Sequence, residues 1–223
     1  VVEIGRTLGI DVPRDPPVFR RDWLITEPVH NLELALRKFA NIQSIWCSEE
    51  VIERLTFETC EDACAQGLKI LELRYSPDFI AEGHPQLGFD AIHRAVVRGV
   101  ERAAGLPIAI GLIGIVRKIL APEKAEYTTD FVIENRDGFV GIDLADQDIG
   151  FGIRRFAPMI ERARAAGLHF TTHCGEDDVP EAPQHVRVGI QELGAERMGH
   201  GIFIYRDPAV MALARERRVL FEL

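Results

Sequence analysis

Short apolar runs alternate along the chain with longer segments whose apolar residues recur at helical spacing. In the segment before residue 105, for example, Ile92, Val96 and Val100 fall on one face of a helix. The run over 108–116 is almost wholly apolar, which is typical of a strand covered on both faces. The pattern predicts six strands, which begin near residues 68, 108, 139, 169, 197 and 219.

Each predicted strand is separated from the next by one predicted helix. Such alternation requires parallel pairing through crossover helices. No glycine-rich phosphate-binding motif follows the strands, which favours a (β/α) barrel over a dinucleotide-binding sheet. With 223 residues, of which 47% are hydrophobic, the chain can bury a substantial core. We therefore expect an α/β fold, a TIM-type (β/α)8 barrel, that forms a single domain over residues 1–223.

The signals for helix boundaries are clear after residue 48 and weaker before it. Ser48 and the acidic residues after it predict the start of a helix, and Gly67 supplies its left-handed stop. The first part of the chain is less regular, because a proline-rich connector over 13–17 leads to a predicted helix over 32–39.

Residues with catalytic chemistry gather where the later strands end. His173, Gly175 and Glu176 follow a β-branched run, and Gly175 can adopt a backbone conformation that turns Glu176 toward the cavity that His173 faces. His200 lies at the end of the next strand between two glycines. In (β/α) barrels the catalytic residues gather at the C-terminal strand ends. Three carboxylates lie at or just past the end of an earlier strand: Asp143, Asp146 and Asp148.

Five short motifs, taken together, resemble the adenosine deaminase family of zinc amidohydrolases. Their order and spacing match the family, and they span nearly the whole chain. The motifs are ELRYSP at 72–77, GIDLA at 141–145, HCGE at 173–176, GHG at 199–201 and FEL at 221–223.

The resemblance implies a barrel that holds one Zn2+ ion and deaminates a purine. It assigns His173 as a zinc ligand, Glu176 as the acid that protonates a purine ring nitrogen, and His200 as the group that orients the attacking hydroxide. The implied reaction is hydrolytic deamination of adenosine or a related aminopurine to the hydroxyl product plus ammonia. The implied partner is therefore a small purine nucleoside or base.

The sequence departs from the family pattern in two places. The family takes further zinc ligands from a His-x-His motif on its first strand and an Asp-Asp pair on its last, and neither motif occurs here. We therefore expect the 223 residues to cover roughly strands 2 to 7 of the barrel, without the first and last strands and the zinc ligands they carry. Asp146 stands where the family has a glycine whose backbone contacts the purine, so we assign Asp146 to substrate binding.

Charge and hydrophobicity argue against nucleic acid and membranes as partners. The net charge is −9, and no cluster of Lys and Arg forms a basic stripe, so nucleic acid is not expected as a partner. No apolar run reaches transmembrane length, so no membrane association is expected. The four cysteines form no CxxC pair, which indicates a reducing compartment and predicts a cytoplasmic protein.

Other interpretations of the same residues remain open. The barrel could be a metal-free, noncatalytic protein that binds a purine or a protein partner, or a hydrolase that acts on a different amine. His173 could be a core histidine, Glu176 a helix cap and His200 a turn residue, while Asp146 and Asp148 could be solvated loop carboxylates. We expect Cys174 to pack behind its strand, because adjacent strand residues point apart. Four further histidines are predicted at the surface: His30, His84, His93 and His185.

Overall fold

The computed structural model describes residues 2–10, 12–28, 32–148, 150 and 152–223, and for residues 32–37 it describes the backbone alone. The chain divides into two compact units. The helical unit comprises Val1–Leu71 and Pro77–Ile110, and the sheet unit comprises Glu72–Ser76 and Gly111–Leu223. That residues 1–223 form a single domain stays a prediction. No helix in the described ranges is long and apolar enough to cross a membrane.

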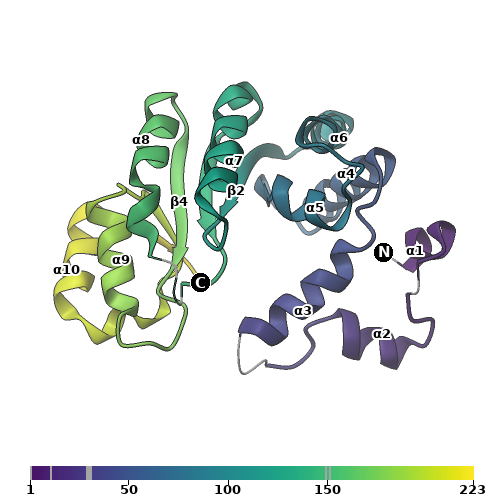
Figure 1. The fold of residues 1–223 in the computed structure, drawn as a ribbon. Coiled ribbons are helices and arrows are strands. Elements are labelled where there is room, and N and C mark those ends of the chain that lie inside the picture. Colours follow the sequence, from purple (N-terminus) through teal and green to yellow (C-terminus); the bar gives the residue numbers. More distant parts are fainter. Residues whose placement is uncertain (1, 11, 29–31, 149, 151) are drawn as a thin grey trace. The chain divides into compact units, whose positions relative to one another are not determined.

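The strands follow one another across a six-stranded sheet in sequence order. The pairs from β2 to β6 are parallel, so each strand is followed by a helix that returns the chain to the same end (Figure 1). All six predicted strands are confirmed, each beginning within two residues of its predicted position. The strands are β1 (Ile70–Tyr75), β2 (Ala109–Arg117), β3 (Gly141–Ala145), β4 (His169–Cys174), β5 (Arg197–His200) and β6 (Leu220–Glu222).

Helices cover the strands of the sheet unit, as Figure 1 shows for α7 to α10. Both α8 and α9 contact β4, and α7 packs against α8. The core between these layers is apolar, with Phe156, Ile160 and Phe170 almost fully buried. The helical segments are α7 (Pro122–Glu134), η2 (Arg136–Gly138), η3 (Ile153–Phe156), α8 (Ala157–Ala165), α9 (Ala182–Gln191), η4 (Ile202–Arg206) and α10 (Pro208–Arg217).

Side chains alternate between the two faces of β4. A Cβ placed on Gly189 of α9 would lie 3.3 Å from Thr172 Cγ2 and 3.7 Å from Cys174 Sγ, so these two residues face the helices. Because side chains alternate along a strand, His173 faces the opposite side of the sheet. Cys174 is fully buried, and burial raises its pKa well above that of an ordinary thiol. The prediction that Cys174 packs behind the strand is confirmed.

The helical unit contains more regular structure than the sequence indicated. Residues 2–8 are helical, and Pro16 and Pro17 begin a helix instead of extending a connector, because proline suits the first helical turn. Gly67 ends α4 with φ +90°, as predicted. The segments of this unit are α1 (Val2–Leu8), α2 (Pro16–Trp23), α3 (Leu32–Gln43), α4 (Glu49–Ala65), α5 (Pro77–Gly83), α6 (Phe89–Arg102) and η1 (Ala103–Gly105).

The assignment of histidines to the surface fails at the three that the structure describes. His84 and His93 are each only 9% exposed, and His185 is half-buried, so their assignment to the surface was wrong. The ring of His84 satisfies its burial with a 3.0 Å contact to the carbonyl of Gln43. Burial lowers the pKa of His93. His30 lies outside the described residues.

Helices α4 and α6 approach closely at Gly99, which makes this glycine a test of their packing. A Cβ at Gly99 would lie 2.5 Å from Thr56 Cβ and 2.7 Å from the carbonyl of Glu53. Gly99→Ala should therefore lower the free energy of unfolding by about 1–3 kcal/mol, measured by chemical denaturation of the intact protein. A Cβ at Gly105 meets no atom within 4 Å, so Gly105→Ala is the matched control. Equal midpoints for both variants would contradict the close approach.

Candidate active site

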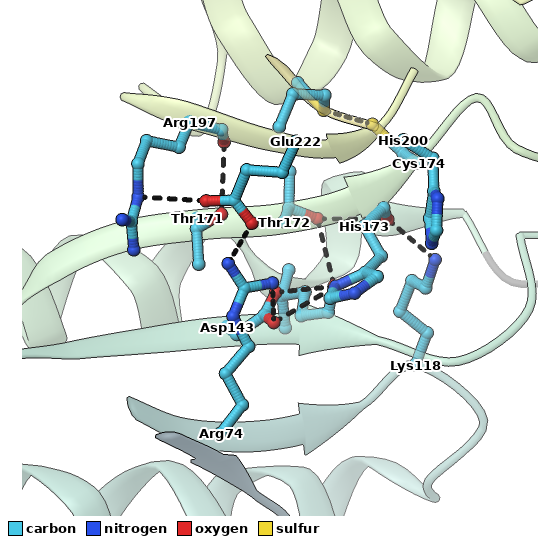
Figure 2. Close-up of polar contacts among 12 residues, drawn as sticks. Arg74, Lys118, Asp143, Thr171, Thr172, His173, Cys174, Arg197, His200 and Glu222 are labelled. Atoms are coloured by element: carbon cyan, nitrogen blue, oxygen red, sulfur yellow. Dashed lines mark hydrogen bonds and ion pairs between the residues drawn. The ribbon is translucent and has the colours of Figure 1, made fainter. Parts of the chain in front are cut away.

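Three candidate residues from two neighbouring strands meet at one end of the sheet. In the parallel register of β4 and β5, His173 lies opposite Gly199 and Cys174 lies opposite His200. The rings of His173 and His200 are 5.3 Å apart between centroids (Figure 2). Glu176 Oε2 lies 3.3 Å from His200 Nε2. The structure therefore brings together His173, Glu176 and His200, as the strand-end positions predicted.

Two glycines make this convergence possible. Gly175 has φ +70°, and a Cβ there would lie 2.6 Å from Val186 Cγ2. Gly201 has φ +62°, and a Cβ there would lie 2.4 Å from the ring of Phe221. Both positions require glycine for backbone conformation and for space. The turn at Gly175 brings Glu176 to His200, whose ring lies beside that of His173, so Glu176 turns toward the side of the sheet that the sequence predicted.

The ring of His173 is held by a buried carboxylate. His173 Nδ1 lies 3.0 Å from Asp143 Oδ2, and the Asp143 side chain is fully buried. Arg74 Nη1 lies 3.2 Å from the same oxygen. Since Asp143 engages Nδ1, Nε2 is the ring nitrogen of His173 left for a metal ion or a substrate.

The face of the sheet on which His173 lies, opposite the helices, is called the inner face. A chain of alternating charges extends across it from Asp143. Arg74 also pairs with Glu222, and Glu222 Oε1 lies 3.3 Å from Arg197 Nε (Figure 2). Arg197 in turn pairs with Glu72. The sequence analysis missed this network, although the charged residues two apart in β1, Glu72 and Arg74, were a signal that one face of that strand is polar.

Burial and neighbouring charges shift the pKa values of Glu176 and His200 in opposite directions. Burial raises the pKa of Glu176, and the opposing effects of Lys118 and His173 do not cancel it. Burial lowers the pKa of His200, and the neighbouring positive groups His173, Lys118 and Arg74 lower it further. Glu176 thus keeps its proton to a higher pH than a free glutamate, and His200 loses its proton at a lower pH than a free histidine.

His173 titrates in the opposite direction to His200. Burial acts to lower the pKa of His173, but the hydrogen bond and negative charge of Asp143 outweigh burial and raise it. A ligand histidine must be neutral to bind a metal ion, so metal binding would compete with a proton for this ring.

Asp146 and Asp148 lie in the same loop but in different environments. Asp146 is half-buried, has φ +81°, and accepts a 2.8 Å hydrogen bond from the amide of Gln147. Its backbone therefore adopts the left-handed conformation that glycine favours. Asp148 is only 2% exposed, so the interpretation of Asp148 as a solvated loop carboxylate was wrong.

The sequence analysis also missed Lys118, which pairs with Asp148. Lys118 Nζ lies 2.5 Å from Asp148 Oδ1, and the Lys118 side chain is fully buried. The available signal was a lysine directly after β2, a nine-residue strand that is apolar except for its last residue, Arg117. A lysine at the end of a buried strand requires a partner, because an unpaired buried ammonium is costly.

The donors in the described ranges do not complete a metal site. They contain no group of three or more His, Cys, Asp and Glu side chains placed to hold a metal ion. A cavity of about 250 Å3 lies near the opposite strand ends, where β3, β4 and β5 begin. It is lined by residues that include Gly141, His169 and Arg197, and not by His173, Glu176 or His200. The cavity is therefore separate from the catalytic candidates.

Comparison with known proteins identifies the family of this chain. A family model described as adenosine deaminase matches residues 1–223. The chain belongs to the adenosine deaminase family. An adenosine deaminase of Klebsiella pneumoniae (strain 342) is 32% identical over 224 residues, which are 100% of this chain and 66% of that relative. The chain therefore spans 66% of the length of this curated relative.

Solved structures confirm the barrel fold class. An adenine deaminase from Arthrobacter aurescens superposes with a TM-score of 0.85 at 21% identity, covering 99% of this chain and 65% of that one. An amidohydrolase from Burkholderia ambifaria with bound zinc superposes with a TM-score of 0.83 at 22% identity, covering 99% of this chain and 59% of that one. At these identities the likeness establishes the fold alone.

The raised pKa of Glu176 predicts a pH-dependent effect on stability. Because the folded pKa exceeds the unfolded value of about 4.3, the stabilisation from protonation is complete below that value and is lost as pH rises through the folded pKa. Glu176→Gln is neutral at every pH, so it should raise the Tm of the intact protein at pH 8 and have little effect near pH 4. Calorimetry at both pH values measures this difference.

A surface substitution provides the control for this measurement. Glu161 on α8 is exposed, so Glu161→Gln should give the same small Tm change at both pH values. If Glu176→Gln lowered the Tm at pH 8, burial would not be what governs the carboxyl of Glu176.

Proposed function

We propose that the protein containing this chain catalyses hydrolytic deamination of adenosine or a related aminopurine, with release of ammonia. The observation that carries the proposal is the 3.3 Å approach of Glu176 Oε2 to His200 Nε2 beside His173, in a chain of the adenosine deaminase family. The names of the Klebsiella and Arthrobacter relatives, adenosine deaminase and adenine deaminase, support an aminopurine as the substrate.

In this proposal His173 contributes one ligand to a zinc ion through Nε2. The contact from Asp143 to Nδ1 supports this assignment, since ligand histidines commonly give their other ring nitrogen to a carboxylate. The bound zinc of the Burkholderia amidohydrolase supports the choice of metal. When bound, zinc would lower the pKa of a water molecule to about 7 and so supply a nucleophile at neutral pH.

Glu176 acts as the proton donor to a purine ring nitrogen. Its raised pKa favours the protonated carboxyl, which can donate a hydrogen bond that a carboxylate cannot. Protonation of the ring makes the amino-bearing carbon more electrophilic. His200, whose pKa is lowered, offers a neutral ring nitrogen that orients the attacking water and accepts its proton. His200 then gives this proton to the amino group, which leaves as ammonia when the C–N bond breaks, and the product returns a proton to Glu176.

We further propose that Asp146 contacts the purine through its backbone. The left-handed conformation of Asp146 reproduces what a glycine would adopt there, and the bond from Gln147 N–H draws the carboxylate back to its own loop. Both features support a pocket in which the side chain of Asp146 does not oppose an aminopurine.

We propose a small purine as the only partner of the site and a cytoplasmic location. The net charge of −9 supports the expectation that nucleic acid is not bound. All four cysteines are free, which supports a reducing compartment.

The catalytic roles predict a loss of turnover without loss of fold. In the intact zinc-loaded protein, Glu176→Gln and His200→Asn should each lower kcat for adenosine by roughly a hundredfold or more, because each removes a proton-transfer group. Steady-state assays of ammonia release measure kcat, and metal analysis should give the parent zinc content. Glu192→Gln, at the surface, is the control. Parent-like turnover in either variant would remove that residue from the mechanism.

Asp146 gives a test of substrate choice. Asp146→Gly relieves a left-handed non-glycine residue, so it should stabilise the protein by up to about 1 kcal/mol and leave kcat/KM for adenosine within about threefold of the parent. Competition assays with several aminopurines provide the comparison. A large gain in kcat/KM for adenosine, with parent activity on another aminopurine, would mean that Asp146 selects against adenosine.

A further inference from the structure

The Lys118–Asp148 pair lies directly beneath the turn that carries Glu176. Both side chains are fully buried, and they come from separate segments: Lys118 follows β2 and Asp148 follows β3. The turn itself follows β4, so three consecutive strand ends meet at this pair.

Each member of the pair bonds to a different peptide group of the turn. Lys118 Nζ donates to the carbonyl of His173 at 2.8 Å (Figure 2). Asp148 Oδ2 accepts from the amide of Gly175 at 2.7 Å, while its other oxygen accepts from Lys118. The ion pair therefore holds the two peptide groups on either side of Cys174.

Further contacts hold the pair in place. The amide of Lys118 donates to the carbonyl of Ala145 at 2.8 Å, and Arg155 Nη2 donates to the carbonyl of Lys118 at 2.5 Å. The amide of Asp148 donates to Asp177 Oδ2 at 3.1 Å. The ring of His185 on α9 approaches Asp148 Oδ2 at 3.5 Å. The pair is thus fixed before any substrate arrives.

From the other side, the turn is held by the chain after β5. The amide of Gly201 donates to the carbonyl of Cys174 at 2.9 Å, and the amide of Phe203 donates to the carbonyl of Gly175 at 3.0 Å. These two bonds come from the segment next to His200. The turn therefore lies between two sets of contacts, the Lys118–Asp148 pair on one side and the segment after His200 on the other.

We propose that Lys118 and Asp148 are positioning residues, a buried clamp that fixes the Gly175 peptide so that the carboxyl of Glu176 meets His200. Stability alone does not account for the pair, since well-packed apolar residues often replace a buried ion pair at no cost. Positioning does account for it, because one peptide separates the clamped amide of Gly175 from Glu176. A displacement of about 1 Å in a reacting group can lower a rate about a hundredfold.

The test rests on the proposed function and uses the intact, zinc-loaded protein. Lys118→Met and Asp148→Asn each leave one buried charge unpaired, so both single variants should have a lower Tm. The double variant Lys118→Met/Asp148→Asn removes both charges and retains an acceptor for Gly175 N–H, but removes the donor to the carbonyl of His173. It should regain most of the lost Tm, while kcat stays at least about tenfold below the parent and KM changes less than about threefold.

Two further variants separate positioning from stability. Lys118→Arg restores the charge and a donor, so it should recover part of the kcat that Lys118→Met loses. Ile160→Val removes a methyl group from the core of the sheet unit away from the cluster, so it should lower the Tm and leave kcat unchanged. A double variant with parent kcat would overturn the proposal.

Hydrogen exchange gives a readout that does not depend on turnover. The amide of Gly175 should exchange faster in the double variant than in the parent or in Ile160→Val, because its acceptor is no longer held by Lys118. If the parent deaminates no aminopurine, the proposed function fails, and the exchange rates alone then decide for or against the clamp. Equal exchange rates of the Gly175 amide in the parent and in the double variant would overturn the proposed clamp.

Discussion

The parallel register between β4 and β5 is the constraint on which the candidate site depends. It places Cys174 opposite His200, so two short turns begin at the same level of the sheet. A shift of one residue would move His173 to the helical face and Cys174 to the inner face, because side chains alternate along a strand. The apolar packing of the outer face against α9 excludes that shift, so the core of the fold also sets the chemistry of its inner face.

Burying charged side chains on the inner face costs free energy because they lose their hydration, and this explains why they are paired there. Asp143 and Lys118 are completely buried ionic side chains, and each is satisfied by more than one partner. An unpaired charge at either position would lose its hydration without compensation. The network allows this face of the sheet to carry charged side chains without contact with solvent. Its members come from different strands, which explains why they converge only in the folded chain.

The sequence predicted the fold better than it predicted the site. The six strands and the stop at Gly67 follow from local pattern, since apolar periodicity and glycine conformation are properties of neighbouring residues. The strand-end position likewise predicted that His173, Glu176 and His200 converge. By contrast, the sequence carried a signal for Lys118 and for Arg74 but not the identity of their partners, which are distant in the chain.

The links from Arg74 to Asp143 and Glu222 have a consequence for the order of folding. Arg74 and Glu222 are separated by 148 residues, so their contact can form only after most of the sheet has assembled. Contacts of such large sequence separation carry a high loop-closure entropy and form late. The contact of His173 with Asp143 needs only β3 and β4, whereas the contacts of Arg74 with Asp143 and Glu222 need β1 and β6 as well. The Arg74–Glu222 contact therefore reports that the first and last strands of this sheet are both in place, long after its individual strand–helix units can form.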